Sequence, residues 1–514
     1  MNDHTDTTRR DLLKAGMAGT ALASLGAAGC SRSQPVAEGL QRETAPPPDW
    51  ILPLARSVEG PAAYTPEVEG TLPADLAGTL YRNGPGRFDR GQRRKKHLLD
   101  GDGFVQRLHF AEGRVHFRAA FVQTPKFERE EAADRFLYST WTTPRPGGPL
   151  RNLGGGPMQS QAGITVYPVG DRVYALDEGN PAWSLDPDTL ATLGSHQLGE
   201  GNIGIKAHSK LDPVSGEWLL AGQDFGRVSS LNTVIHDQAG DLLHQHRVSD
   251  QPLRYFHDFL ATEHYYVFVL HPCVLNPFGF LFGMRSVVDS LEWQPELGNR
   301  VVVVPRSGGE PRNFEATGAF MWHALNAHER GDEIVADIVA YDHPDHFIPI
   351  NGREPLLSAL MEGRMGAAEE PGRIRRYVIN LRTGQLREEI LHNGNHEFPF
   401  VDPRTATLRH RVGYFAWSGI GTMNTGIKRM DMDSGAEQVF DFGPGTHVGE
   451  PVFAADSSDQ TDAGWLLAQC LDGASGRAFY AVFDARQVAA GPLARIWLQD
   501  ALPISFHGWW QPLA

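Results

Sequence analysis

Cysteine is scarce in this sequence. Cys30, Cys273 and Cys470 are the only three among 514 residues, and they lie far apart. Three scattered cysteines supply neither a disulfide framework nor the ligands of a zinc knuckle. The sequence therefore excludes a disulfide-stapled fold and a cysteine-based metal site.

An excess of positive charge is also missing. Lysine and arginine number 47 against 62 aspartates and glutamates, which gives a formal net charge of -15. Proteins that track phosphates carry a basic stripe or patch, so nucleic acid is excluded as a partner. The chain is 41% hydrophobic, which is enough to bury a large core at this length.

The first 30 residues lack the long apolar run of a membrane span. In "TTRRDLLKAGMAGTALASLGAAGC", Arg9 and Arg10 precede a short and mildly apolar Ala/Gly segment. This pattern resembles a twin-arginine export signal, a type that carries folded proteins across a membrane. The string "AAGC" resembles a lipobox, in which Cys30 would be lipidated. We expect a protein exported to the bacterial periplasm, either soluble or lipid-anchored at the envelope.

Two segments follow the signal. Residues 31–55, which contain "APPPDW", are rich in proline and predict a tether. No comparable linker occurs after it. We therefore expect residues 56–514 to form a single domain.

Sustained helical periodicity is rare in that domain, and "PLLSALMEGRM" is its best example. Short runs such as "YYVFVLH", "EIVADIVAYD" and "AFYAVFDA" have strand composition. Turn segments such as "NLRTGQLR" and "MDSGAEQV" separate them. The pattern predicts an all-β domain of many hairpins. A β-propeller avoids exposed strand edges at this size, whereas a pair of β-sandwiches also satisfies the pattern.

The chain has 21 histidines, and four of them stand beside apolar or aromatic neighbours in well-separated segments. They are His208 in "GIKAHSKLDP", His257 in "RYFHDFLATE", His323 in "FMWHALNAHE" and His507 in "ISFHGWW". A histidine of this kind, taken singly, is more often a hydrogen-bonded core residue than a ligand. In a propeller, however, the inner strands of different blades converge on the axis, so four distant histidines can share one ion. Histidines in polar company are expected in solvated loops: His343, His346, His392 and His396.

These four segments, in this order, resemble those of the carotenoid cleavage oxygenases. That family includes apocarotenoid oxygenases, lignostilbene dioxygenases and the retinal isomerase of the visual cycle. The resemblance extends from about residue 68 to residue 510 and includes "GTLYRNGPGRF", "HLLDGDGFVQRLHF", "GEPVFAAD" and "FHGWW". It implies a seven-bladed β-propeller with a helical and loop cap over one face. It also implies one Fe(II) per subunit on the propeller axis, held by the four histidines just named.

Neutral imidazoles suit Fe(II), and four of them leave positions open for dioxygen. A ligating imidazole usually donates its other N–H to a carboxylate. By the same resemblance, Glu178 orients His257, Glu397 orients His323 and Glu450 orients His507, which leaves His208 without a carboxylate. No protein residue beyond this metal centre is expected to act as a catalytic acid or base.

The segment "HPCVLNPFGFLFGM" places aromatic residues at alternating positions. One interpretation is a buried strand face. The other is an apolar mouth that takes a polyene from a membrane and brings about peripheral membrane association. The candidate mouth residues are Leu275, Phe278, Phe280, Leu281 and Phe282.

Lignostilbene-type members of the family carry a lysine next to the first of the three glutamates, where it contacts a phenolic oxygen. This sequence has Asp177 there. Because a carboxylate would repel a phenolate, we expect Asp177 to disfavour hydroxystilbenes.

The resemblance implies a non-haem iron dioxygenase that cleaves a conjugated C=C bond of an apocarotenoid or carotenoid to two carbonyl products. Dioxygen is then the co-substrate. Two alternatives stay open, a stilbene-cleaving dioxygenase and a propeller that binds ligands without catalysis.

Overall fold

The computed structural model describes residues 49–513, apart from residues 157, 180, 202, 226–228, 252–253, 366–369, 420, 459 and 500. The expected export signal, Cys30 and most of the proline-rich tether lie outside the described residues. The described residues belong to one compact unit.

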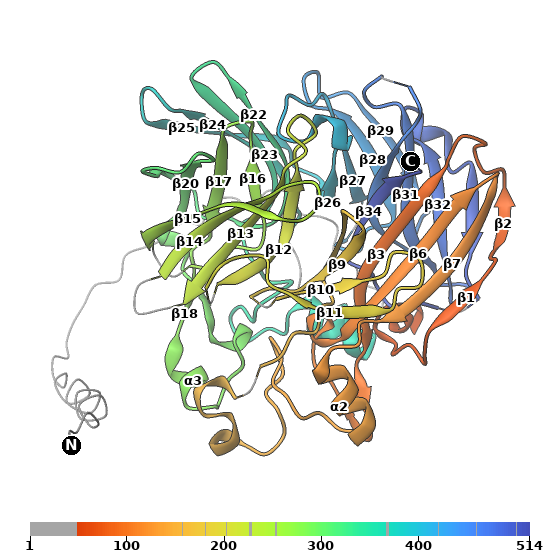
Figure 1. Cartoon of the computed structure of the whole chain (residues 1–514), viewed down its shortest axis with the longest axis horizontal. Helices are drawn as coiled ribbons and strands as arrows, with labels where there is room; N and C mark the ends of the chain where they lie inside the picture. The colour runs from red at the N-terminus through yellow and green to blue at the C-terminus, as the bar shows by residue number, and fades with distance from the viewer. Residues whose placement is uncertain are drawn as a thin grey trace. The chain divides into compact units, whose positions relative to one another are not determined.

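Short strands rich in β-branched and aromatic residues build the domain, as their composition predicts. In the described part of the chain, seven antiparallel sheets of four or five strands form the blades of a propeller (Figure 1). Blades 1 to 3 contain the following strands: β1 (Ala62–Tyr64), β7 (Arg114–Phe121), β6 (Asp102–Ala111), β3 (Gly78–Arg87) and β34 (His507–Pro512) in blade 1; β8 (Thr165–Val169), β9 (Arg172–Leu176), β10 (Ala182–Leu185) and β11 (Thr192–His196) in blade 2; β12 (Gly204–Leu211), β13 (Trp218–Phe225), β14 (Ser229–His236) and β15 (Leu242–Gln251) in blade 3.

The second half of the chain forms the other four blades. Their strands are β16 (Phe259–Ala261), β17 (Tyr265–Leu270), β20 (Asn299–Pro305) and β21 (Arg312–Ala316) in blade 4; β22 (Phe320–Arg330), β23 (Glu333–Tyr341), β24 (Arg373–Asn380) and β25 (Gln385–His392) in blade 5; β26 (Asn395–Phe400), β27 (Val412–Ser418), β28 (Gly426–Asp431) and β29 (Glu437–Asp441) in blade 6; β30 (Thr446–Ala455), β31 (Gly464–Asp472), β32 (Arg477–Asp484), β33 (Ala494–Trp497) and β2 (Glu67–Gly70) in blade 7.

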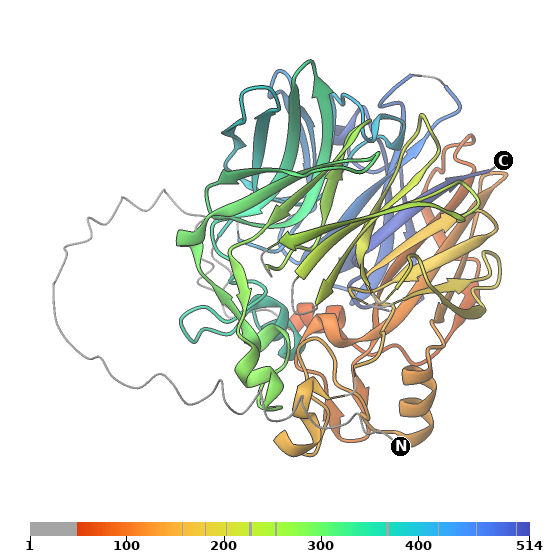
Figure 2. The same ribbon diagram turned by 60° about the vertical axis from the view of Figure 1, so that its left-hand side comes forward.

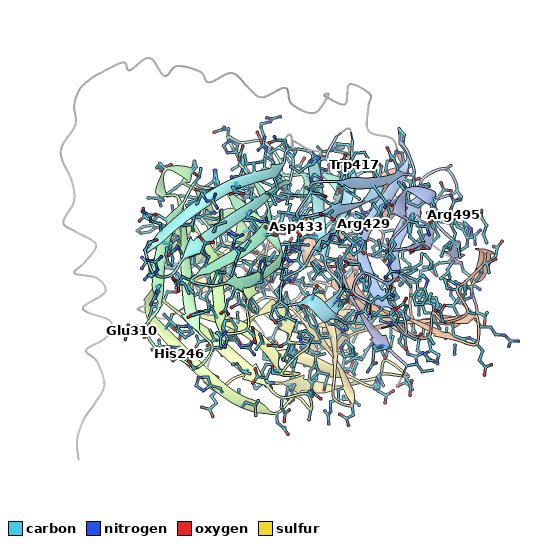
Figure 3. All side chains as sticks on the ribbon, turned by 90° about the horizontal axis from the view of Figure 1, so that it is seen from above. His246, Glu310, Trp417, Arg429, Asp433 and Arg495 are labelled. Carbon is cyan, nitrogen blue, oxygen red and sulfur yellow. The ribbon has the colours of Figure 1, made fainter. Side chains whose placement is uncertain are left out.

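One edge strand of each blade faces the centre of the ring. These inner strands follow one another around the axis in the order β12, β16, β22, β26, β30, β34 and β8, and each contacts the next. Between the last and the first, the contact is made by β9, the strand beside β8 in blade 2, which contacts β12. Figure 3 shows the ring from above, with His246 and Glu310 near one edge and Arg495 toward the opposite edge. The inner strands therefore bring residues that are distant in sequence to one axis.

Two pairings between the ends of the domain close the ring. β34 pairs with β3 in a register that runs from Asn83↔His507 to Gly78↔Pro512. β2 pairs with β33, so an N-terminal strand also completes the last blade. Because each blade then has neighbours on both sides, the pairings remove the open edge that a fan of sheets would otherwise have.

Apolar clusters fill the space between neighbouring blades. Leu80 and Leu108 of blade 1, for example, belong to one cluster with Val452 and Tyr480 of blade 7. Trp218 of blade 3 is fully buried with Tyr174 of blade 2. The hydrophobic core is therefore divided among the interfaces between blades. The axis itself is lined by polar side chains.

The α-helices and two small hairpins gather on one side of the ring (Figures 1 and 2). The α-helices are α2 (Pro125–Ala133), α3 (Pro277–Leu281) and α4 (Leu356–Ala359). The hairpins are β4 (Asp89–Arg90) with β5 (Arg93–Arg94), and β18 (Cys273–Leu275) with β19 (Leu291–Trp293). The 3₁₀ helices of the domain are η1 (Asp49–Ala55), η2 (Leu98–Asp100), η3 (Pro149–Gly155), η4 (Val288–Ser290), η5 (Pro295–Leu297), η6 (Leu360–Glu362), η7 (Pro403–Thr405) and η8 (Val488–Ala490).

The all-β propeller with a helical cap is confirmed, and the helix expected in "PLLSALMEGRM" is present as α4 followed by η6. Residues 49–55, however, which were expected to belong to the tether of residues 31–55, are part of the folded domain. They form η1, whose Ile51 and Leu54 are buried in an apolar cluster with Leu360. Helix α2 was not predicted, because its charged sequence has no clear apolar stripe.

Two of the histidines expected in solvated loops are buried instead. His346 accepts a hydrogen bond from the indole N–H of Trp322. His396 is fully buried, and its Nδ1 lies 2.8 Å from the carbonyl oxygen of Gly394. Their polar sequence neighbours gave no sign of the aromatic rings that pack against them, Trp322 and Tyr341 at His346 and Phe415 at His396. Within the described residues, no helix is long and apolar enough to cross a membrane.

Candidate metal centre

The inner strands carry the four singled-out histidines to the propeller axis. His208 lies on β12, His323 on β22 and His507 begins β34, while His257 lies two residues before the start of β16. All four are buried, and one ring nitrogen of each lies within 4.8 Å of those of the others. Segments separated by up to 299 residues thus meet because each ends at the same axis.

The spacing of these nitrogens fits a single metal ion. His208 Nε2 lies 3.0 Å from His257 Nε2, and His323 Nε2 lies 3.1 Å from His507 Nε2. With metal–nitrogen bonds of about 2.1 Å, two ligands at right angles are roughly 3.0 Å apart and opposite ligands roughly 4.2 Å apart. The four histidines can therefore hold a metal.

Three of the histidines contact a glutamate through the other ring nitrogen. His507 Nδ1 lies 2.8 Å from Glu450 Oε1. His257 Nδ1 contacts Glu178 Oε1, and His323 Nδ1 contacts Glu397 Oε2. Glu397 and Glu450 belong to β26 and β30, the inner strands of blades 6 and 7. These are the three pairs expected from the sequence.

The glutamates fix the direction of the histidine lone pairs. A carboxylate accepts the Nδ1 proton, so Nε2 of a neutral ring carries a lone pair. In His323 and His507 these lone pairs then face one another across 3.1 Å. Two facing acceptors repel, and a cation between them replaces the repulsion by attraction. The donor set itself thus favours an ion.

Burial shapes the electrostatics of the centre. It lowers the pKa of His208, which the other three histidines lower further, and it lowers the pKa of His507 to about 4 although Glu450 opposes the shift. At His323, burial would lower the pKa, but the carboxylates of Glu397, Asp258 and Glu450 together raise it. Burial would raise the pKa of Glu178, but Lys206 and His257 lower it to about 2. The glutamates are therefore ionised at neutral pH and add negative charge around a cation site.

His208 differs from the other three, as expected. Its Nδ1 makes no direct hydrogen bond to a carboxylate, and Asp258 Oδ2 lies 4.0 Å away. That aspartate is paired with Lys210, whose Nζ lies 2.9 Å from Oδ1. Asp258 also accepts the backbone N–H of Ala324 at 2.9 Å. It therefore ties three inner strands together beside the centre.

The family model described as retinal pigment epithelial membrane protein matches residues 53–512. The chain belongs to the carotenoid cleavage oxygenase family. It is 30% identical over 497 residues to apocarotenoid-15,15'-oxygenase of Synechocystis sp., with 93% of this chain and 99% of that protein covered. It is 26% identical to isoeugenol monooxygenase of Pseudomonas putida, with 87% and 94% covered.

Solved structures of apocarotenoid oxygenase have the same fold as this chain. Cobalt-substituted Synechocystis apocarotenoid oxygenase superposes with a TM-score of 0.84 at 29% identity, covering 90% of this chain and 98% of that one. Because the curated relatives are cleavage oxygenases, this family member is an enzyme of the dioxygenase class.

An apolar cavity opens directly at the centre of this oxygenase. Its volume is about 910 Å³, including space open to solvent, and His257, His323 and His507 form part of its wall. The cap covers it, because η2, α4 and η6 contribute Leu99, Leu356, Leu357 and Leu360. A narrower apolar extension shares Leu99, Ile164, His257 and Trp322 with it and continues to Val287, Val288 and Leu291.

A second cavity reaches the same four-histidine centre from another side. His208, His323 and His507 line it together with the Lys210–Asp258 pair. Asn326 and Trp509 also belong to its lining. It is more polar than the capped cavity, so the two sides of the centre offer different environments.

The expected mouth residues do not form a buried strand face. Residues 277–281 form α3, and Leu275, Phe278, Phe280, Leu281 and Phe282 line neither apolar space. Phe278 is 69% exposed and Phe282 56% exposed. Phe280 packs on Gly155 of η3 so closely that a Cβ at position 155 would clash with its ring.

Asp177 also differs from the expectation. It is buried, and its carboxylate accepts hydrogen bonds from the indole N–H of Trp141 at 3.2 Å and the backbone N–H of Gln161 at 3.0 Å. It lines neither apolar space. Asp177 therefore stabilises the loop that carries Glu178, and its carboxylate does not face the apolar space in which the expectation placed it.

Sequence reasoning missed two residues that contact Glu178. Lys206 Nζ lies 3.2 Å from Oε2, and the hydroxyl of Tyr255 donates to Oε1 at 3.0 Å. Each stands two residues before a centre histidine, Lys206 before His208 and Tyr255 before His257. Residues two apart in an extended chain point to the same face, so Lys206 and Tyr255 could have been expected beside the centre from their spacing to the histidines.

Proposed function

We propose that the protein is an Fe(II)-dependent dioxygenase that cleaves a conjugated C=C bond of an apocarotenoid or carotenoid to two carbonyl products. The observation that carries the proposal is the four-histidine cluster at the wall of a capped, mainly apolar cavity. The similarity to apocarotenoid-15,15'-oxygenase over nearly the whole chain supports the same substrate class.

His208, His257, His323 and His507 would hold one iron, whose contribution is to bind and activate dioxygen. The chain's own residues do the rest. Glu178, Glu397 and Glu450 keep the imidazoles in the ligating orientation. The apolar walls contributed by Leu99, Ile164, Trp322 and the cap exclude water and hold a polyene, and its position along the cavity determines which bond is cleaved.

A phenolic substrate is the second candidate, because isoeugenol monooxygenase is also a relative. The test is a direct comparison. Iron-loaded protein is incubated with an apocarotenal and with a hydroxystilbene, and the aldehydes are identified by mass spectrometry. We expect cleavage of the apocarotenal with the larger kcat/KM. Aldehydes from the stilbene alone would contradict the substrate class, and turnover of neither would support a ligand-binding propeller.

We also propose peripheral membrane association through an apolar patch made by η3 and α3. The patch consists of Leu150, Leu153, Phe278, Leu281, Phe282 and Met284, all exposed. The two helices contact one another, and α3 also contacts η4, whose Val288 lines the apolar extension of the cavity. A polyene leaving a bilayer at the patch would thus be close to an apolar path to the centre.

Export by the twin-arginine route, with lipidation of Cys30 as one form of the mature protein, belongs to the same proposal. It rests on the sequence of residues 1–30. Mass spectrometry of the mature N-terminus in a native host tests it. An intact leader would contradict export, and an unmodified Cys30 would remove the lipid anchor.

A further inference from the structure

His447 is an inner-strand histidine that the metal centre does not use. It lies on β30, three residues before Glu450, and is 5% exposed. Neither of its ring nitrogens has a protein hydrogen-bond partner. Among the residues that the structure describes, no other histidine has both ring nitrogens buried and unpaired. A buried imidazole without partners is costly, so its position calls for a ligand group.

Asn424 stands beside it. The backbone carbonyl of Asn424 accepts the N–H of Val448 at 2.9 Å, which places the two residues on adjacent segments. Asn424 is also 5% exposed, and its side-chain Oδ1 is buried without a partner. Both side chains line the apolar cavity whose wall includes three of the centre histidines.

Several other polar residues on that wall are already engaged, although His346 Nδ1 and Glu397 Oε1 are also buried without a hydrogen-bond partner. Asn395 Nδ2 donates to Ser418 Oγ at 2.8 Å, and its Oδ1 accepts the N–H of Gly372 at 3.1 Å. His346 accepts from Trp322. Glu370 Oε2 lies 3.5 Å from Arg373 Nη1. Among the described residues of this wall, His447 is therefore set apart by having both ring nitrogens unpaired, and Asn424 adds an unpaired amide oxygen on the adjacent segment.

The chemistry of the pair defines what it can bind. Burial lowers the pKa of His447 to about 4, and the charge of Arg82 acts in the same direction, so the ring is neutral at pH 7. A neutral imidazole offers one N–H donor and one acceptor, and an amide offers both kinds of group as well. A hydroxyl or carbonyl oxygen can satisfy such a pair.

A charged end group fits less well. The described residues that line this cavity include no lysine or arginine, whereas Glu370 contributes a carboxylate. A carboxylate ligand would be desolvated there without a cationic partner. The wall near the pair, formed by Met423, Ile504 and Phe506, is apolar. The cavity therefore suits an apolar chain that ends in one neutral oxygen group.

We propose that His447 and Asn424 bind the uncharged, oxygen-bearing end of the substrate, a terminal hydroxyl or aldehyde. By fixing one end of the chain, they determine which double bond lies at the metal centre. This inference rests on the proposed function and assigns two residues of the cavity wall to the polar end of its substrate. His447 and Asn424 are specificity-determining residues in this account.

The test uses three polyenes of equal length that end in an alcohol, an aldehyde or a methyl group. The iron-loaded protein, the variants His447→Phe and Asn424→Leu, and the matched control His116→Phe on the exposed face of β7 are compared. Dissociation constants are measured without oxygen from the polyene absorbance, and kcat/KM and products are measured in air. The alcohol and the aldehyde arms identify which oxygen group the pair prefers.

We expect the wild-type protein and His116→Phe to bind the alcohol or aldehyde about tenfold or more tighter than the methyl-ended polyene. Each cavity variant should lose that preference and give products from more than one double bond. Asn424→Leu repeats the test independently if His447→Phe fails to fold. Equal binding of all three polyenes by the wild type, or an unchanged preference in both variants, would overturn the inference. Binding is measured without turnover, so the role of His447 and Asn424 is tested even if the wild type cleaves no polyene. Absence of cleavage would count against the proposed function alone.

Discussion

His507 Nδ1 lies 2.8 Å from Glu450 Oε1, while the other oxygen of the same carboxylate accepts the backbone N–H of Gly508 at 2.7 Å. Glu450 therefore fixes both the ring and the backbone of the last centre histidine. β34 begins at this histidine and also closes blade 1 through β3. The end of the chain thus serves the metal centre and the closure of the propeller at once.

The first prediction concerns this contact. Glu450→Gln removes the carboxylate that orients His507 and should weaken iron retention about 10- to 100-fold. Iron per protein after competition with a chelator measures the effect. Glu263→Gln, on an exposed loop, is the matched control and should retain iron like the wild type. Equal retention in Glu450→Gln would show that the contact has no such role.

A single substitution tests the ligand role of His507 better than a truncation. Removing the chain from His507 onward would also remove β34, the inner strand of blade 1. His507→Ala leaves the strand in place and should abolish tight iron binding while circular dichroism stays that of a folded β-protein. A folded variant that still holds one iron as tightly as the wild type would rule His507 out as a ligand.

Closure of the propeller is expected to depend on Trp510. Its buried ring lies 5.7 Å, centroid to centroid, from that of Phe110 in blade 1. Trp510→Ala should lower the free energy of unfolding by about 3–5 kcal/mol, because it leaves a cavity at the closing strand. Urea denaturation measures the change. Trp417→Ala, at a half-buried site, should cost clearly less, and equal losses would contradict a special role for the closing strand.

Much of the centre could be predicted because its residues lie in short recognisable strings. His323 and Glu397 belong to such strings, and their blades bring them together. Asp177 was misjudged, since its hydrogen bonds to Trp141 and Gln161 depend on a loop that the local sequence does not reveal. His447 gave no signal at all, because what distinguishes it is a lack of partners, a property of the whole folded environment.

The two cysteines of the folded domain are expected to be unreactive in the native protein. Cys273 and Cys470, the two within the described residues, are free and buried. Burial raises the pKa of the Cys273 thiol to about 12 and also raises that of Cys470, so neither forms the reactive thiolate at neutral pH. Native protein should resist iodoacetamide and react at both positions after denaturation, as peptide mass spectrometry would show. Rapid labelling of the native protein would contradict this burial.

The apolar patch of η3 and α3 is expected to contribute to binding of lipid vesicles. Replacing Phe278 and Phe282 by serine removes two exposed aromatic rings and should reduce co-sedimentation with lipid vesicles severalfold, by loss of apolar area buried in the bilayer. The matched control is the double replacement of Leu243 and Leu493, which are exposed outside the patch, by serine. Equal vesicle binding by both double variants and the wild type would argue against the patch.

The central claim is that the four histidines hold the iron that splits a C=C bond with dioxygen. Its most direct test is a short reaction of the protein with an apocarotenal under ¹⁸O₂, in the metal-free state and after loading with Fe(II) or Zn(II). We expect one labelled oxygen in each of the two carbonyl products, with Fe(II) only. Unlabelled products, or equal turnover without iron, would contradict it.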